Sequence, residues 1–423
     1  MLPLSCVKIR PVGAESVSHT PREGNNMKVR SRVTLALAAA ALLSLSGVTL
    51  SGQAPAQGKA ATPAKAPEQG KAAPAAAGTP KITAGDFFKN VTTPTLKVLS
   101  PDDFILAMGV LTDDLGLDCA DCHPGAGSDK ADFVIDTPQK KTARKMIEML
   151  GTINKTNFAG VQMVTCWTCH HGRDIPATTI ALDAVYSAPN NERDDVVKAV
   201  PGQTAAAIFD KYIAALGGAQ KLAAITSYIA TGKSVGYEGL GGEGDFNVYA
   251  KSPNQKTTEI SYKDHPERGT SLWAFDGRTG WIKTPRGLLG EYEVTGTGVD
   301  GVRFDAQMAF PGNIKTLFTN WKVGQMESLG DRDFNIIQGG TARGLLVTMY
   351  FDTKTNLLSR MIIYTSSPIG RAPQQVDFSD YRDVNGVKFP FEETFLWLDG
   401  RWTAKITGIK TNVAIDAKKF GKP

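Results

Sequence analysis

Two short stretches of the sequence carry one pattern, in which two cysteines stand three positions apart and a histidine follows directly. They are Cys119-Ala120-Asp121-Cys122-His123 and Cys166-Trp167-Thr168-Cys169-His170. C-x-x-C-H is the attachment signature of c-type haem, in which both thiols join the vinyl groups and the histidine is the proximal iron ligand. The sequence therefore predicts two covalently attached haems, with Cys119, Cys122, Cys166 and Cys169 as anchors and His123 and His170 as axial ligands.

Two simpler interpretations of these cysteines are a pair of short disulfides and a single zinc site built from all four thiols. Either one explains the cysteines but leaves a histidine directly after each pair as a coincidence. The fifth cysteine, Cys6, lies upstream of a predicted export signal, so it adds no partner to the mature chain. Covalent haem is therefore the preferred interpretation.

The sixth ligand of the first iron is predicted to be Met108. Ser100 can cap a helix whose first residue is Pro101, and Gly116 can end it. Within it, Met108 falls on the same face as the apolar residues that recur at helical spacing. A short turn then leads to Cys119, so this helix can bring Met108 to the haem of His123. The alternative role for Met108 is a core methionine.

A second helix is predicted from Thr137-Pro138 to about Asn154. Met146 lies eight residues before Asn154, as Met108 lies eight before Gly116, and this parallel favours Met146 as ligand of the second iron. Met149 is one turn away on a neighbouring face and remains the rival. Met163 is too close to Cys166 in the sequence to reach the far side of the haem ring.

Two further histidines remain in the mature chain. His171 follows the proximal ligand His170, so helical geometry turns its side chain about 100° away from that iron. It is expected at the surface near the haem edge. His265 lies in a polar turn and is also expected at the surface.

The stretches LGLDCADCHPG, KKTARKMIEMLGTIN and VTCWTCHHG resemble the haem-binding part of the photosynthetic reaction-centre cytochrome c subunit family. The resemblance covers about residues 86–176. It implies that Cys119, Cys122 and His123 hold one haem with Met108, and that Cys166, Cys169 and His170 hold another. The family binds four haems where this chain has two motifs, and His171 stands where the family usually has arginine. An electron carrier of photosynthesis or of another exported redox chain fits these motifs.

The start of the chain is typical of an exported protein. Met27 opens a second apparent start, followed by a basic segment, an apolar run over residues 33–48 and an A-x-A cleavage site at residues 54–56. An uncleaved signal anchor is the alternative. The formal net charge of +5 includes +4 from residues 1–56, which leaves +1 for the rest and gives no reason to expect nucleic-acid binding.

Composition divides the 423 residues into five parts. Residues 1–56 are an upstream extension and signal peptide, and 57–82 are a low-complexity linker. A mostly helical dihaem domain is predicted for 83–180, a second linker for 181–202 and a β domain for 203–423. The expected location is the periplasm, with membrane contact only through an uncleaved anchor or a membrane complex.

The last part begins with a helix that is capped at Thr204 and ends at Gly217-Gly218. Eleven or so short runs with strand signals follow, separated by turn residues, so we expect a curved antiparallel sheet or half-barrel. Tryptophans of these strands, such as Trp273, are expected in the core. Asp276, Asp352 and Asp383 each precede turn residues and are expected to hydrogen-bond those turns.

The stretches DKYIAALGGAQKL, AFDGRTGW, YFDTKTNLLSR and DYRDVNGVKFPF resemble exported lipoprotein-carrier and lipoprotein-sorting-factor domains. That resemblance implies a curved antiparallel sheet closed by helices over an apolar cavity. It also implies a hydrophobic-ligand site. As its ligand or partner we hypothesise a lipid, a quinone or a lipoprotein.

The sequence thus predicts an α + β protein that transfers electrons between redox partner proteins through two haems. No catalytic residue is predicted. Two alternatives belong to other classes: a dihaem peroxidase, which needs one iron with a displaceable ligand, and a lipid- or lipoprotein-binding module with a haem appendage.

Overall fold

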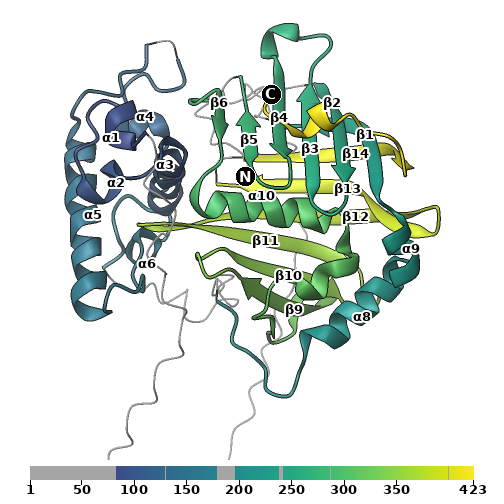
Figure 1. The fold of residues 1–423 in the computed structure, drawn as a ribbon. Helices are drawn as coiled ribbons and strands as arrows, with labels where there is room; N and C mark the ends of the chain where they lie inside the picture. The colour runs from purple at the N-terminus through teal and green to yellow at the C-terminus, as the bar shows by residue number, and fades with distance from the viewer. Residues whose placement is uncertain (1–81, 129, 179–195, 238–241, 286, 399) are drawn as a thin grey trace, which may run out of the picture. The chain divides into compact units, whose positions relative to one another are not determined.

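The computed structural model describes residues 82–128, 130–178, 196–237, 242–285, 287–398 and 400–423 (Figure 1). All of these residues lie in one compact unit of the chain. The predicted signal peptide and nearly all of the low-complexity segment fall outside the described residues. Among the described residues, no helix combines the length and the apolar character needed to cross a membrane.

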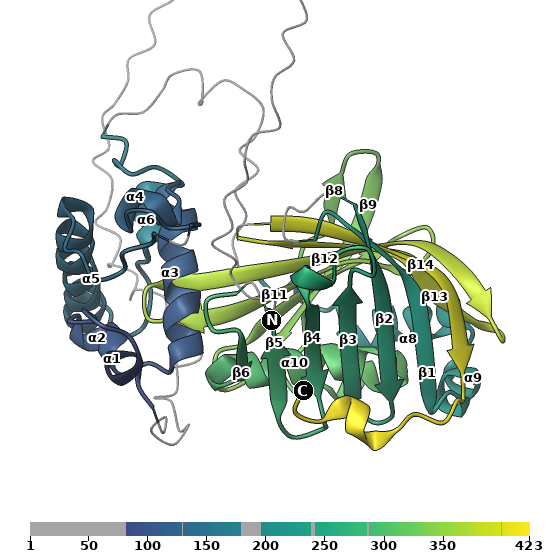
Figure 2. The same ribbon diagram turned by 90° about the horizontal axis from the view of Figure 1, so that it is seen from above.

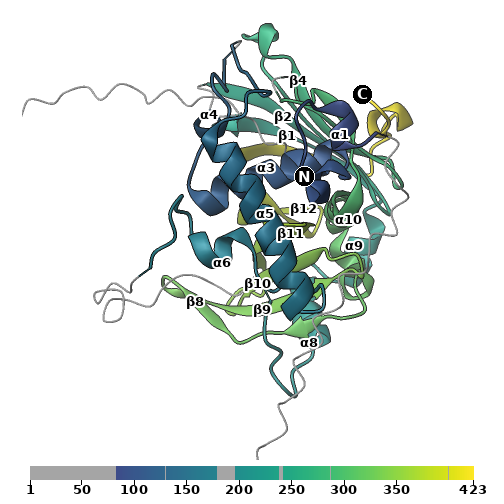
Figure 3. The same cartoon turned by 90° about the vertical axis from the view of Figure 1, so that its left-hand side faces the viewer.

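Six helices form the region that contains both C-x-x-C-H motifs. They are α1 (Ala84–Phe87), α2 (Pro94–Lys97), α3 (Pro101–Leu115), α4 (Cys119–Cys122), α5 (Pro138–Asn157) and α6 (Cys166–His170). Figure 3 shows α5 crossing this face of the molecule, with α6 beside it. The prediction of a mostly helical region around the motifs is confirmed.

The long helix α3 has the ends that its sequence predicts. The Ser100 hydroxyl accepts a hydrogen bond from the Asp103 N–H, Pro101 occupies the first turn, and Gly116 adopts the left-handed conformation that ends the helix. At Gly116 a side chain would also meet the Gly172 carbonyl oxygen. Glycine is therefore required both for the turn and for the close approach of the second motif.

Fourteen antiparallel strands form one sheet in the remainder of the chain. The first six are β1 (Ser227–Val235), β2 (Glu243–Lys251), β3 (Gln255–Ser261), β4 (Thr270–Phe275), β5 (Gly280–Lys283) and β6 (Glu291–Glu293). The others are β7 (Lys322–Val323), β8 (Glu327–Leu329), β9 (Arg332–Gly340), β10 (Leu346–Asp352), β11 (Leu358–Ser367), β12 (Gly370–Val384), β13 (Val387–Trp397) and β14 (Gly400–Thr411). The prediction of a large antiparallel sheet is confirmed.

The strand order shows how the chain builds this sheet. From β1 the chain steps outward strand by strand to β6, crosses over, and then returns from β7 through β9–β13 to β14, which pairs with β1. The β1–β14 ladder shifts register between Thr231 and Gly232, and a side chain at Gly232 would meet the Lys405 carbonyl oxygen. Such bulges bend strands, and Figure 2 shows that the sheet is curved.

Helices cover the inner side of the curved sheet. They are α8 (Ala205–Leu216), α9 (Ala219–Ala224), α10 (Gly296–Met308) and the 3-10 turn η3 (Pro311–Thr316). The short 3-10 turns η2 (Pro266–Arg268) and η4 (Ala417–Phe420) complete the fold. Buried side chains of α8 such as Phe209 pack with Met349 and Phe351 of β10. On α10, Val302 and Ala306 pack against Phe275 and Ile282.

The tip of the β11–β12 hairpin belongs to the core of the helical region. Ile369 at this tip is 1% exposed and packs with Val110 of α3 and Leu150 of α5. Its carbonyl oxygen accepts a hydrogen bond of 3.2 Å from the Cys166 N–H, and the Gln162 side chain donates to the Ser367 carbonyl at 2.9 Å. The second motif is thus held in part by a residue that follows it by about 200 positions.

The three turn aspartates have the role that the sequence predicts. The Asp276 carboxylate accepts from the Arg278 and Thr279 N–H groups, and Asp352 accepts from those of Lys354 and Thr355. Asp383 accepts from the Gly386 N–H at 2.9 Å. All three carboxylates stabilise the reversals between strands.

We predict that Phe351→Ala lowers the free energy of unfolding of the sheet by about 3–5 kcal/mol. The side chain is fully buried between α8 and the sheet, so its loss leaves a cavity. Urea unfolding followed by far-ultraviolet circular dichroism measures the change. Met326→Ala is the control, because that side chain is 63% exposed and its loss should cost little. Equal losses for the two variants would contradict the assignment of this core.

Candidate haem sites

The first motif is presented on a single helical turn. The Asp118 carboxylate accepts from the N–H groups of Ala120 and Asp121, and the Asp121 carboxylate accepts in return from the Asp118 N–H at 2.7 Å. This capping box fixes α4, so Cys119 and Cys122 stand one turn apart and His123 follows at the end of the helix. The sequence D-C-x-D-C therefore explains the local shape of the motif.

A cavity of about 410 Å³ adjoins this motif. Cys119, Cys122 and His123 line it, and so does Met108 from the middle of α3. An apolar cavity of about 150 Å³ holds one benzene ring, so this cavity has room for a ligand considerably larger than a single ring. Most of the other lining side chains are apolar, including Phe88, Phe104, Ile105, Leu111, Leu115 and Ile147.

The imidazole of His123 is in the state that an iron ligand requires. Burial, and then the charge of Lys140, lower the pKa of His123 to about 4, so the ring is neutral at physiological pH. Its Nδ1 atom is buried and has no hydrogen-bond partner. Only a neutral imidazole offers a lone pair to a metal.

Two cations from α5 complete the wall of this cavity. Lys140 and Arg144 both line it, as do Lys89 and Asp118, and Arg144 also forms an ion pair with Asp136. Positive groups of this kind suit the two propionate carboxylates that every c-type haem carries. In size, ligand types and charge, the residues around the first motif therefore fit a haem, which Cys119, Cys122, His123 and Met108 would hold.

The second motif uses the same local device with different residues. The Thr165 hydroxyl accepts from the Thr168 N–H, and the Thr168 hydroxyl accepts from the Thr165 N–H at 3.0 Å, so that α6 has its own capping box. The Nδ1 atom of His170 lies 2.8 Å from the Arg173 carbonyl oxygen. A carbonyl at this atom makes Nδ1 the donor and leaves Nε2 free to bind a metal.

The state of the cysteines in the structure bears on the alternatives to covalent haem. Cys122, Cys166 and Cys169 are free thiols, so neither motif is closed by a disulfide of its own. Among the described residues, no three His, Cys, Asp or Glu side chains form a cluster that could hold a metal ion.

Asp114 connects the end of α3 to the second motif. Its carboxylate accepts a hydrogen bond of 2.9 Å from the Trp167 N–H, and its carbonyl oxygen accepts one of 3.0 Å from the Gly172 N–H. The side chain is only 6% exposed, and burial raises the pKa of Asp114 to about 7. Burial, and then the charge of Asp114, raise the pKa of the Cys166 thiol to about 12.

The helix α5 runs further than its sequence predicts. It ends at Asn157 rather than about Asn154, because the Asn154 side chain is buried and binds the returning chain at Met163 and Val164. The parallel that favours Met146 therefore does not hold: Met108 lies eight residues before its cap Gly116, whereas Met146 lies twelve before Phe158 (158 minus 146).

The two candidate ligands of the second iron both lie on the outer side of α5. Met146 is 39% exposed and Met149 is 47% exposed, whereas Ile147 and Leu150 face the core. Met146 is closer to this buried stripe, and Met149 is closer to the end of the helix. Both remain candidates.

The other two histidines lie where the sequence predicts a surface. His171 is exposed and ends α6 in the left-handed conformation, with its ring centroid 5.6 Å from that of Trp167. It is therefore a cap residue and does not continue the helix. His265 lies in a turn, with its Nδ1 atom 3.1 Å from a Glu267 carboxylate oxygen.

This region is cytochrome c-like. It has two capped C-x-x-C-H turns, and a helix places a methionine at the same cavity as one of them. Residues 45–216 match the model of the photosynthetic reaction centre cytochrome C subunit family. The corresponding subunit of Rubrivivax gelatinosus is 32% identical over 128 residues, which are 29% of this chain and 32% of that protein. The chain thus spans about a third of that relative, and the resemblance predicted from the motifs is confirmed.

The sheet region has similar solved structures. A LolA superfamily protein from Nitrosomonas europaea covers 52% of this chain and 99% of its own, with 13% identity and a TM-score of 0.35. A DUF1329 family protein from Desulfovibrio piger covers 51% of this chain and 96% of its own, with 12% identity and a TM-score of 0.36. Both scores are low, so nothing about a ligand follows from them.

We predict that Asp114→Asn removes a pH-dependent loss of stability. The carboxyl ionises at about pH 7 in the folded chain and near its ordinary 3.8 in the unfolded chain, so the folded form binds more protons between these values. Its contribution to stability is therefore lost as pH rises from about 4 to 7. The variant keeps an acceptor for Trp167, and its melting temperature at pH 8 should exceed that of the wild type by a few degrees.

Thermal unfolding of the haem-loaded protein at pH 4.5 and pH 8 measures this effect, with little difference expected at the lower pH. Asp264→Asn is the control, because Asp264 lies exposed in a turn. If Asp114→Asn kept the wild-type dependence on pH, the buried carboxyl would not be its source.

Proposed function

We propose that the protein is an exported dihaem c-type cytochrome that carries electrons between redox partner proteins. The observation that supports this most strongly is that Met108, Cys119, Cys122 and His123 line one mostly apolar cavity of about 410 Å³. The family match of residues 45–216 supports covalent haem, and the second motif extends the proposal to two haems. The periplasm is the proposed location.

A bound haem supplies a one-electron couple at its iron. The protein residues define what that couple can do. His123 is a neutral ligand, and Met108 reaches the same cavity from a second helix, a pair that favours electron transfer over ligand exchange. Most of the lining side chains are apolar, which would keep the reorganisation of the surroundings small. At the second motif we propose His170 with Met146, and Met149 as its rival.

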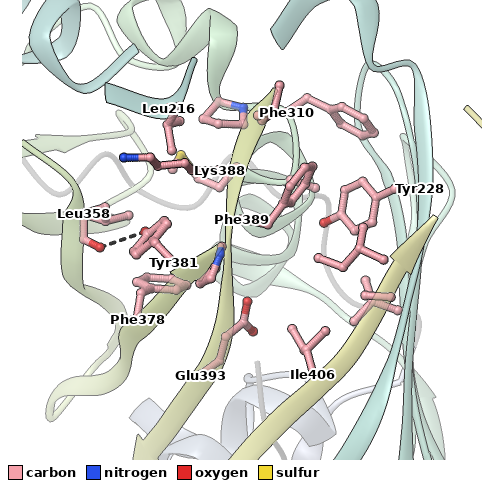
Figure 4. Close-up of a pocket in the computed structure, with 18 of the residues that line it drawn as sticks. Leu216, Tyr228, Phe310, Leu358, Phe378, Tyr381, Lys388, Phe389, Glu393 and Ile406 are labelled. Atoms are coloured by element: carbon pink, nitrogen blue, oxygen red, sulfur yellow. Dashed lines mark hydrogen bonds between the residues drawn. The ribbon is translucent and has the colours of Figure 1, made fainter. Parts of the chain in front are cut away.

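The curved sheet is proposed to bind a hydrophobic ligand or to dock a partner. Between the sheet and its helices lies a cavity of about 110 Å³ lined by side chains such as Leu216, Tyr228, Phe389 and Ile406 (Figure 4). Most of these lining side chains are apolar, as the lining of a hydrophobic-ligand site would be. Membrane contact would come through an uncleaved signal or a membrane complex.

We predict two covalent haems in protein matured with a c-type attachment system. The pyridine haemochrome spectrum and the mass of the denatured chain measure their number. Replacing Cys119 and Cys122 by alanine should remove one haem, and replacing Cys166 and Cys169 should remove the other. A chain that keeps its haem after losing both cysteines of a motif, or that holds fewer than two, would refute the dihaem proposal.

We predict that Met108→Ala opens one iron only. The reduced wild type should not bind carbon monoxide at neutral pH, whereas the variant should bind it at one haem. The reduction potential of that haem should fall by on the order of 0.1 V, within the roughly 0.8 V range that axial ligands set. Met146→Ala and Met149→Ala are a matched pair, of which one should open the second iron. Ready carbon monoxide binding by the wild type at both haems would overturn the ligand assignment, and peroxide turnover would favour the peroxidase alternative.

A further inference from the structure

The two proposed haem sites differ in how far the protein encloses them. The first motif adjoins the mostly apolar cavity of about 410 Å³, which Met108 lines from α3. At the second motif Cys169 is exposed and Trp167, between the two cysteines, is 39% exposed, as are both candidate methionines of α5 in similar measure. A ferric haem carries one more positive charge than a ferrous haem, so contact with water favours the ferric form and lowers the reduction potential.

Four charged side chains line the first cavity, and together they are positive: Lys89, Lys140, Arg144 and Asp118. Lys89 and Asp118 are exposed, so solvent screens them, whereas Lys140 and Arg144 are half-buried. The Arg144 guanidinium is paired with Asp136 at 2.6 Å, but the Lys140 ammonium donates to two neutral backbone carbonyl oxygens at 2.8 and 3.0 Å. Asp121 and Asp132 are nearby and do not line the cavity. A positive charge beside a haem favours the ferrous form and raises the potential.

At the second motif the buried charge is a carboxylate. Asp114 is 6% exposed, and its carboxylate accepts from the Trp167 N–H between the two cysteines. Burial, and then the charge of Asp114, raise the pKa of the Cys166 thiol, so this charge acts on the motif itself. Asp113, half-buried beside it, adds to the negative charge. A negative charge at this place favours the ferric form and lowers the potential.

The cations near the second motif do not cancel Asp114. Arg173 and Asp174 are adjacent, exposed and opposite in charge, so solvent screens both. A side chain at Gly370 would lie 3.4 Å from the Asp114 carboxylate, so Arg371, the next residue of β12, points to the other face of that strand. The negative charge at this motif is therefore uncompensated.

The two proximal histidines differ in the partner of their second ring nitrogen. The Nδ1 atom of His170 lies 2.8 Å from the Arg173 carbonyl oxygen, whereas the Nδ1 atom of His123 is buried without a hydrogen-bond partner. A hydrogen bond from Nδ1 makes an imidazole a more basic metal ligand, and a more basic ligand favours the ferric iron. The second motif therefore has the stronger donor.

We infer that the haem of the second motif has the lower reduction potential and the haem of the first motif the higher one, so that electrons pass from the second to the first. Enclosure, buried charge and the histidine partner all act in this direction. One electron moves: it leaves a ferrous iron at the second motif, which becomes ferric, and reduces a ferric iron at the first. This inference rests on the proposed dihaem function and specifies the direction of flow. Asp114 and Lys140 act on the irons through their charge and are not ligands.

The test is a redox titration of the full-length, haem-loaded protein at pH 8, followed by haem absorbance. At this pH the Asp114 carboxyl, whose pKa is about 7, is mostly ionised. The equilibrium constant for passing an electron from the second haem to the first should be at least about tenfold, which is about 59 mV for one electron. The variant without Cys166 and Cys169 keeps only the first haem, and the variant without Cys119 and Cys122 keeps only the second, so the pair assigns the two potentials.

Single substitutions test the two charges. Asp114→Asn should raise the lower potential only, and Lys140→Gln should lower the higher potential only, each by about threefold or more in the reduction equilibrium constant. Lys140→Arg keeps the charge and should restore the potential. Asp174→Asn and Lys141→Gln are the matched controls, because these neighbouring charges are exposed and should shift neither potential. Circular dichroism and haem content verify that each variant is folded and loaded.

Two haems with equal potentials, or a first haem that titrates below the second, would show the inference to be wrong while the dihaem function stands. The wild type and the two single-haem variants decide this even where Asp114→Asn does not fold. If Asp114→Asn moved the lower potential no more than Asp174→Asn does, the buried charge would not set it. A protein with only one covalent haem would overturn the dihaem function and this inference together.

Discussion

The hydrogen bonds of Asp114 are the interaction on which the helical region depends. One residue at the end of α3 binds the backbone at the start of α6 through its carboxylate and the backbone just after α6 through its carbonyl oxygen. The same helix carries Met108 and leads directly into the first motif. Asp114 therefore fixes the two C-x-x-C-H turns relative to each other, although Cys119 and Cys166 lie 47 positions apart in the sequence (166 minus 119).

Much of the first site could be predicted from sequence, because its ligands lie on elements with strong local signals. Ser100, Pro101 and Gly116 define α3, and Met108 follows from helical spacing. The second site was harder to predict. The end of α5 depends on Asn154, whose amide binds Met163 and Val164, and no local pattern reveals such a tertiary contact. The cationic wall of Lys140 and Arg144 likewise appears only when α5 packs beside the cavity.

In the sheet, too, some elements follow from local sequence patterns and others depend on tertiary contacts. Eleven or so strands were predicted from local signals, whereas fourteen form, among them the short strands β7 and β8. The helix α10 was not predicted, because Gly296, Gly298 and Gly301 lower its intrinsic propensity, and burial of Val302, Phe304 and Ala306 outweighs this. The first part of β12 contains Pro373, which is typical of a loop but here pairs opposite Tyr364.

The contact between Cys166 and Ile369 has a consequence for the order of events while the chain is made. The two residues are 203 positions apart (369 minus 166), and domains fold from the N-terminus during synthesis. The second motif therefore emerges long before the hairpin that supports it. During that interval the core around its two thiols is incomplete. For the proposed second haem, the attachment machinery would meet an accessible, loosely held segment, and the hairpin would complete the core later.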